Sequence, residues 1–171
     1  MKSKVPTIEL DRYDRRILEE LQRDGGLSNQ RLAERIGLSP SPCLRRVQAL
    51  EEAGILRKRV ALLDPQSLGL ALMVLMHISM DRHTPERFEH FEAEIRRSPE
   101  VLECYLITGH DADYQIKVAV RDMAHFQEFL LNRLTRIEGV TGVHSSFVLR
   151  RVVDTTELPV YGSLFVFSSD A

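Results

Sequence analysis

Only two residues, Gly37 and Leu38, separate two helical patterns near the N-terminus. The first pattern covers residues 28–36, where Ser28 is a good N-cap and Gly37 supplies the C-terminal stop. The second covers residues 39–54 and opens with two Ser-Pro pairs, in which a serine can cap the helix and the next proline fits its first turn. Two short helices joined so closely are typical of a helix-turn-helix unit.

A third helical pattern, over residues 11–23, precedes this pair. Asp11 can cap its start, and its aliphatic residues recur on one face. After the pair, the sequence "ILRKRVALLD" at residues 55–64 alternates loosely between apolar and polar, which predicts a strand that is either a wing or a connection. We therefore expect residues 1–64 to form a winged helix-turn-helix domain with a connecting strand.

The last of the three predicted helices carries its positive charge close to its start. Leu44, Val47 and Leu50 are expected to form its buried stripe, which leaves Arg45 and Arg46 free to face a DNA groove. Arginine can donate two hydrogen bonds to guanine or bind a phosphate, and the free backbone N–H groups at a helix start also attract phosphate. The other residues predicted to contact DNA are Ser39, Ser41, Pro42, Gln48, Arg31 and Arg57.

Charge is unevenly distributed along the chain. Residues 1–66 hold 13 Lys and Arg against 10 Asp and Glu, whereas residues 67–171 hold 10 against 15. Because phosphate attraction depends on the local surface, the net charge of −2 does not exclude binding to nucleic acid. A simpler alternative is that the two arginines of the last helix are solvated side chains that pair with Glu51 or Glu52.

The pattern of apolar residues changes after a hinge at residues 65–69. The following segments predict the order β-α-β-β-α-β, a ferredoxin-like α+β arrangement in which helices cover one face of the sheet. The other face needs cover, so we expect self-association. We assign residues 65–160 to this domain and residues 161–171 to a tail whose conformation the sequence leaves open. The predicted strands and helices are residues 71–80, 84–98, 101–108, 114–120, 122–139 and 143–153, with Met123 and Phe126 among the inward residues of the last helix.

Several classes of protein are disfavoured by the composition. No apolar run approaches the roughly 20 residues that span a bilayer, and the N-terminus lacks the apolar stretch of a signal peptide. Cys43 and Cys104 have no metal-type spacing, so we interpret both as reduced thiols in a cytoplasmic protein. The histidines lack ligand spacing, and neither a Gly-x-Ser-x-Gly motif nor a phosphate-binding glycine loop occurs. We therefore expect no catalysis, no metal, no cofactor and no membrane association.

Roughly residues 8–160 resemble the leucine-responsive regulatory protein and asparagine-regulator (Lrp/AsnC) family of transcription factors. The most specific block is "LSPSPCLRRVQALE", and the likeness continues through "ALLDP", "PEVLECYLITG", "DADYQIKVAV" and "SSFVLRRVVDTTELP". The resemblance implies that residues 39–48 enter the major groove of double-stranded DNA at the nucleoid. It also implies a C-terminal ligand-sensing domain of the RAM type that dimerises through its sheets, with dimers assembling into octamers.

In this family small effectors, usually amino acids, bind near the contact between dimers and change assembly or DNA affinity. The resemblance places Leu106, Gly109, Asp113 and Tyr114 at or near the effector pocket. From the last strand it adds Ser145 and Ser146. The rival function is an architectural protein that compacts DNA without sensing an effector.

The turn at residues 109–114 departs from the family pattern by one extra residue between the glycine and the aspartate. Either Asp111 or Asp113 can therefore occupy the usual acidic position, and His110 beside them is expected to tune the pocket. A free amino acid needs a partner for each end: backbone N–H groups that a glycine lets approach its carboxylate, and an acid for its ammonium group. The alternative is a plain polar hairpin.

Overall fold

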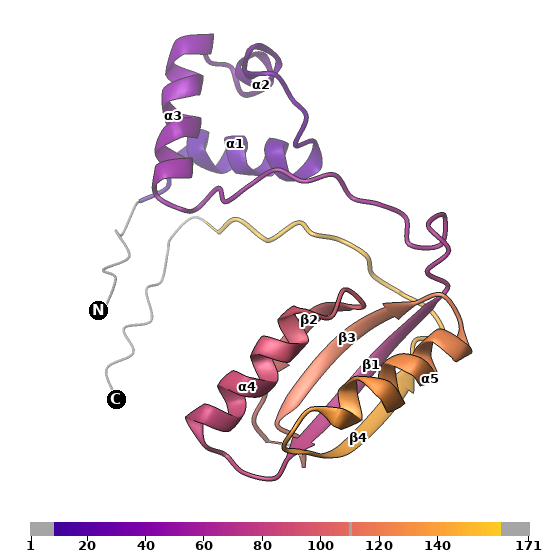
Figure 1. The fold of residues 1–171 in the computed structure, drawn as a ribbon. Coiled ribbons are helices and arrows are strands. Elements are labelled where there is room, and N and C mark those ends of the chain that lie inside the picture. The colour runs from indigo at the N-terminus through magenta and orange to yellow at the C-terminus, as the bar shows by residue number, and fades with distance from the viewer. Residues whose placement is uncertain (1–8, 110, 162–171) are drawn as a thin grey trace. The chain divides into compact units, whose positions relative to one another are not determined.

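The computed structural model describes residues 9–109 and 111–161 of the chain, which form two compact units (Figure 1). One unit combines the residues up to Leu62 with those from Val153 onward, and the other spans Leu63–Val152. The sequence placed the end of the second domain at residue 160. In the structure, residues 153–161 lie instead with the N-terminal unit.

Three helices build the N-terminal unit, and their predicted positions are confirmed: α1 (Arg12–Arg23), α2 (Asn29–Ile36) and α3 (Pro40–Glu52). Asp11 caps α1 through the backbone N–H groups of Tyr13 and Asp14, and Ser28 caps α2 through that of Arg31. Gly37 ends α2 in the left-handed region, with φ of 74°. The core is formed by Ile17, Leu18, Leu21, Leu27, Leu32, Ala33, Ile36, Cys43, Val47 and Leu50.

The predicted buried stripe of α3 is wrong at one position. Leu44 is 45% exposed, whereas Cys43 is fully buried. Cys43, Val47 and Leu50 follow one another at intervals of four and three residues, which places them on a single helix face. Leu44 is rotated away from that face and contributes to the outer surface of the helix.

The strand predicted over residues 55–64 is also wrong, because this fully described segment contains no strand. The N–H groups of Ile55 and Leu56 both donate to the carbonyl of Leu50 and so close the end of α3. The alternation of residues suits a strand, but a strand needs a neighbour with which to exchange backbone hydrogen bonds. The described part of the chain places no such neighbour beside it.

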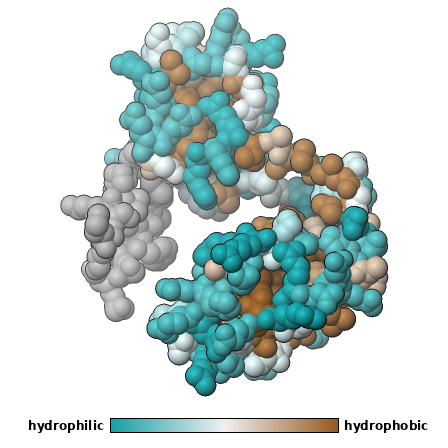
Figure 2. Space-filling view, in the orientation of Figure 1, coloured by the Kyte–Doolittle hydropathy of each residue, from teal (hydrophilic) through white to brown (hydrophobic). Residues whose placement is uncertain are grey.

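The same segment exposes apolar side chains along its length. Val60, Leu62 and Leu63 are all largely exposed, and Figure 2 shows hydrophobic residues gathered where the chain leaves the N-terminal unit. The helices of that unit present mainly hydrophilic side chains in the same view. A wing strand would bury the apolar side chains of the alternating pattern against a sheet. In this segment the same side chains are exposed.

The C-terminal unit is an α+β sandwich of the predicted ferredoxin-like order. Its sheet is antiparallel with strand order β2-β3-β1-β4, and both long helices cover the same face (Figure 1). The elements are β1 (Leu72–Met80), α4 (Pro85–Arg96), β2 (Val101–Leu106), β3 (Tyr114–Val120), α5 (Met123–Asn132), the 3-10 turn Leu134–Arg136 and β4 (Val140–Phe147).

The core of this unit lies between the sheet and its two helices. Alternate residues of β1 and β3 point inward and meet aromatic side chains of α4 and α5. Several boundaries differ from those expected: β2 ends at Leu106, α5 ends at Asn132, before the 3-10 turn, and β4 runs from Val140 to Phe147. Met123, which was predicted to point inward, is exposed, and Phe129 is buried in its place.

The opposite face of the sheet carries no helix among the described residues (Figure 1). The strand register sets His77 directly opposite His144 on this face. This face carries both apolar and polar side chains. They include Met73, Leu75, His77, Lys117, His144 and Ser146.

Candidate functional site

The start of α3 is exposed and has a fixed direction. Ser39 is its N-cap residue in extended conformation, its side chain forms no capping hydrogen bond, and Pro40 opens the first turn. The side-chain amide of Asn29 donates to the carbonyl of Pro40 at 2.8 Å, which ties this turn to α2. Pro40 and Pro42 have no N–H, and the Cys43 N–H donates to the Ser39 carbonyl at 3.3 Å, so within this turn the N–H of Ser41 is the one that can face an anion.

One exposed face of α3 joins three of the predicted DNA-contact residues. Ser41, Arg45 and Gln48 succeed one another at helical spacing, and all three are exposed. Within residues 9–109 and 111–161, Arg45 forms no ion pair or hydrogen bond. Leu44, which sequence reasoning assigned to the core, lies beside this face and adds an apolar group to it. We call Ser41, Leu44, Arg45 and Gln48 the reading face.

Arg46 has different surroundings. Its Nη1 lies 2.8 Å from Asp14 Oδ1 and 2.8 Å from Asp11 Oδ2, both at the start of α1. Its guanidinium carbon lies 5.5 Å from the centre of the Tyr13 ring. The hydrogen bond to Asp14 is the main cause that raises the pKa of Arg46.

The remaining predicted DNA contacts lie around α3. Pro42 is half-buried in the first turn of α3. Arg31 is exposed on α2, and Arg57 is exposed in the segment that follows α3. These three residues stay predictions as DNA contacts.

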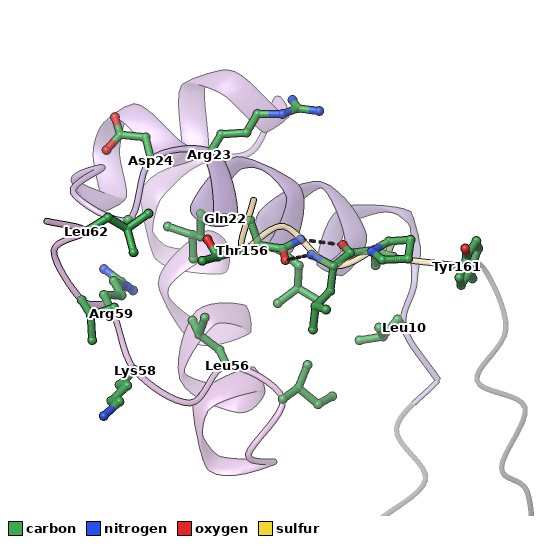
Figure 3. Close-up of a pocket in the computed structure, with 18 residues that line it drawn as sticks. Leu10, Gln22, Arg23, Asp24, Leu56, Lys58, Arg59, Leu62, Thr156 and Tyr161 are labelled. Carbon is green, nitrogen blue, oxygen red and sulfur yellow. Dashed lines mark hydrogen bonds between the residues drawn. The ribbon is translucent and has the colours of Figure 1, made fainter. Parts of the chain in front are cut away.

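A groove on another part of the N-terminal unit is lined by α1, residues 55–62 and the returning residues 156–161 (Figure 3). Its volume is about 1190 Å³, and no residue of α3 lines it. The side-chain amide of Gln22 holds the returning segment: it donates to the carbonyl of Leu158 at 3.0 Å and accepts from its N–H at 2.6 Å. Val160 packs against the core of the unit.

The turn between β2 and β3 separates the two candidate acids. Asp113 accepts a hydrogen bond from the N–H of Met80 at 2.7 Å, and its other oxygen lies 2.7 Å from Nε2 of His83. The side chain of Asp111 is exposed, and its carbonyl accepts from the Ser79 hydroxyl at 2.9 Å. Gly109 adopts φ of 87°. His110 lies outside the described residues.

Tyr114 is a core residue. Its side chain is 1% exposed, and its ring centre lies 4.5 Å from that of Phe91. Its hydroxyl donates to Glu92 at 3.2 Å, and burial is the main cause that raises the pKa of Tyr114. Leu106, its partner across β2 and β3, is 57% exposed. Of this pair, Leu106 is the side chain that a ligand can reach.

Ser145 and Ser146 are not brought to this turn within one chain. They pair with Met76 and Leu75, on opposite faces of the sheet, whereas the turn contacts Ser79. Three residues along a strand correspond to about 10 Å. The β4 residue paired with Ser79 is Gly142, and the hydroxyl of the neighbouring Thr141 donates to the Ser79 carbonyl at 3.1 Å. Sequence reasoning missed Ser79 and His83, because contacts between segments distant in sequence bring them to the turn.

Comparison with protein families decides the identity of these two units. Residues 10–57 match the winged helix-turn-helix DNA-binding family, and residues 73–158 match the Lrp/AsnC ligand binding domain. The chain belongs to the Lrp/AsnC family. Members of this family are transcriptional regulators and not enzymes, and this regulator combines a DNA-binding unit with an effector-binding unit.

Relatives of this Lrp/AsnC regulator match it over nearly their whole length. The leucine-responsive regulatory protein of Salmonella typhimurium is 41% identical over 157 residues, which are 92% of this chain and 95% of the relative. The leucine-responsive regulatory protein of Escherichia coli K12 is 40% identical over the same shares.

Solved structures of Lrp/AsnC regulators agree. A transcriptional regulator of Neisseria meningitidis in complex with L-Met has a TM-score of 0.84 and 45% identity, covering 88% of this chain and 96% of its own. AsnC of Escherichia coli has a TM-score of 0.80 and 27% identity, and the match covers 88% of this chain and 99% of AsnC.

Membrane spans and metal clusters are both absent from the part of this Lrp/AsnC regulator that the structure describes. In residues 9–109 and 111–161, no helix combines the length and apolar character needed to span a bilayer. In the same residues, no three or more His, Cys, Asp or Glu side chains group as a metal site.

Proposed function

We propose that this regulator reads double-stranded DNA through the reading face of α3. The observation that carries the proposal is the exposed Arg45, which is free of ion pairs in the described part of the chain and is flanked by Ser41 and Gln48. An unpaired arginine can donate two hydrogen bonds to guanine, and the apolar Leu44 suits the methyl group of thymine. Ser39, Pro42, Arg31 and Arg57 would contact the backbone beside it.

A salt-controlled gel shift with an operator fragment tests this proposal. Arg45→Ala should weaken operator binding by about 1–3 kcal/mol while leaving the oligomeric state unchanged. Arg96→Ala is a matched control, because it removes an exposed arginine from α4 in the other unit. Equal affinity of the Arg45 variant and the parent protein would contradict the proposal.

The effector is proposed to be an amino acid bound at the turn between β2 and β3. The ligand-binding domain match and the L-Met complex of the Neisseria relative support this class of ligand. Asp113 already has two partners, so the exposed Asp111 is better placed to accept the ammonium group. Backbone N–H groups around Gly109 would receive the carboxylate, and Leu106 would contact an apolar side chain.

Thermal shift with the free amino acids tests the effector site, since a ligand that binds only the native state raises the melting temperature. Asp111→Asn should abolish the shift without changing the melting temperature of the free protein. Asp113→Asn should instead lower that temperature, because the variant weakens the contact with His83. If no amino acid shifts the melting temperature of the parent protein, the result would favour the alternative function, an architectural protein that compacts DNA without sensing an effector.

Assembly is proposed to proceed through the helix-free face of the sheet. That face exposes apolar side chains among polar ones, and pairing two copies would bury it. Dimers joined this way would carry two reading faces, which predicts a roughly palindromic operator with half-sites about one helical turn apart. In such an assembly Ser145 and Ser146 could approach the turn of another copy, and dimers would combine into octamers. We further propose that the protein works in the cytoplasm, at the nucleoid.

The assembly proposal is tested by native mass spectrometry of the parent protein and of Leu75→Glu. A buried carboxylate without a partner is strongly unfavourable, so the variant should shift the population to monomers. Glu128→Gln on the exposed surface of α5 is a control that should leave the oligomer intact. An unchanged oligomer in the Leu75 variant would place the interface elsewhere.

A further inference from the structure

We infer that Arg46 is a positioning residue: it sets the orientation of α3 by binding the start of α1, and it does not contact DNA. The inference rests on the proposed reading face, because it concerns what holds that face in place. Arg45 and Arg46 are adjacent in sequence and equally able to bind phosphate, so only their surroundings distinguish them.

The first argument is the geometry of the two ion pairs. A single guanidinium nitrogen of Arg46 lies 2.8 Å from a carboxylate oxygen of each of Asp11 and Asp14. The side chain of Asp14 is only 12% exposed. A carboxylate this buried needs a charged partner, because its own desolvation is otherwise uncompensated. Moving Arg46 toward a phosphate would therefore leave Asp14 without its counter-charge.

The second argument is that both carboxylates are held by the helix cap. Asp11 accepts from the backbone N–H groups of Tyr13 at 2.7 Å and Asp14 at 3.0 Å. Asp14 in turn accepts from the N–H of Asp11 at 3.1 Å, which completes a capping box. The acceptors that Arg46 meets thus have fixed positions relative to the axis of α1.

The third argument concerns the position of Arg46 on α3. It lies one residue before the buried Val47 and follows the first turn by a few residues. The Tyr13 ring lies 5.5 Å from the guanidinium carbon, within the range of a cation–π contact. A clasp formed by Arg46, Asp11, Asp14 and Tyr13 therefore joins the start of α1 to the centre of the recognition helix. It fixes both the angle and the rotation of α3.

A lysine could not reproduce this clasp. A guanidinium is planar and presents several fixed N–H groups, whereas an ammonium group is a compact point charge on a flexible stem. The Arg46→Lys variant keeps the charge and should restore phosphate attraction, but it should restore the clasp only in part. This difference separates a positioning role from a phosphate contact.

The test compares Arg46→Met, Arg46→Lys and Arg45→Ala in the full-length protein, with operator affinity measured over a series of salt concentrations. Removing one side chain that binds a phosphate lowers the slope of log affinity against log salt by about 0.9. We expect Arg46→Met to bind about tenfold more weakly with an unchanged slope. Arg46→Lys should recover only part of this loss. Amide hydrogen exchange in α1 and α3 should be faster in the Arg46 variants.

A double-mutant cycle measured in DNA affinity supplies the second readout. Asp14→Asn should also weaken operator binding, and adding it to Arg46→Met should cost little more, because both changes open the same clasp. A lower salt slope for Arg46→Met, full recovery by lysine, or additive effects in the cycle would each overturn the inference. If Arg45→Ala binds as tightly as the parent protein, the proposed reading face itself fails, which is a different outcome.

Discussion

The two units of this regulator are held together by different means. In the N-terminal unit, the buried core formed by described residues between 9 and 62 is aliphatic apart from Cys43. Among these residues it contains no aromatic ring. Polar side chains join its helices: Arg46 binds the start of α1, and Arg16 donates to the carbonyls of Ile36 and Arg35 at 3.2 and 2.8 Å. The ligand-binding unit instead buries a continuous apolar layer between a sheet and two helices, with aromatic rings at its centre.

The difference shows where each unit is sensitive. An apolar layer loses stability when a large side chain is removed, but surface changes affect it little. A small helical unit held by directional contacts can change the angle between its helices without unfolding. Under the proposed function, that angle determines where the reading face of α3 lies relative to the DNA groove.

The largest expected effect is in the apolar layer. Phe91 is fully buried and packs against Tyr114, so Phe91→Ala should lower the free energy of unfolding of the C-terminal unit by about 3–5 kcal/mol. Denaturant unfolding followed by circular dichroism measures this loss. Leu131→Ala, at a side chain that is 59% exposed, should have almost no effect. Similar losses in both variants would contradict the assignment of the core.

The next largest effect is at the turn of the helix-turn-helix. Gly37 has φ of 74°, and no atom lies within 4 Å of the position of an added Cβ. Gly37→Ala should therefore cost about 1–2 kcal/mol through backbone strain alone. Gly25→Ala is the control, since Gly25 is not among the positive-φ glycines of the described residues. The measurement is thermal unfolding of the two variants, and equal melting temperatures would argue against the left-handed turn.

A smaller effect is expected where the chain returns to the N-terminal unit. Gln22→Ala removes both hydrogen bonds to Leu158 and should cost about 0.5–1.5 kcal/mol. Limited proteolysis should then cut within residues 153–161 more rapidly. Gln30→Ala on the exposed face of α2 should leave the cleavage rate unchanged. Equal rates in the parent and the Gln22 variant would show that this contact does not hold the segment.

The smallest effect concerns pH. Burial acts to raise the pKa of Asp11, but the N–H groups of Asp14 and Tyr13 and the Arg46 guanidinium together hold it below its ordinary value of 3.8. A lowered pKa stabilises the folded state above the ordinary value, and this contribution is lost as the pH falls through the folded pKa. NMR titration should show the pKa of Asp11 rising in Arg46→Met. No change would mean that the ion pair is absent in solution.

Much of the fold could be predicted from sequence because the decisive signals were local. Asp11, Ser28 and Gly37 act on backbone groups only a few residues away, so the helix ends of the N-terminal unit were predicted correctly. Leu44 was assigned to the core because it lies three residues before Val47 and Cys43 lies four before it, and helical spacing alone does not distinguish these two positions. The strand at residues 55–64 was predicted from alternation, which does not reveal whether a partner strand is present.

The candidate sites were harder to predict because they depend on contacts distant in sequence. Arg46 meets Asp14 across 32 residues, and nothing near either residue in the sequence indicates that contact. The carboxylate of Asp113 contacts the N–H of Met80 and the ring of His83 because β1 and β3 are neighbouring strands. Sequence could name both acids of the turn, but it could not say that Asp113 is the one bonded to Met80 and His83.

The return of residues 153–161 to the N-terminal unit has a practical consequence. A fragment ending at residue 62 would retain all three helices, yet it would lose the backbone that Gln22 binds and expose to water the apolar groove beside α1. The DNA-reading part is thus discontinuous in the gene, and isolating it requires a fusion that supplies the distant segment. The two units are consequently joined by two covalent connections, one between residues 62 and 63 and one between residues 152 and 153.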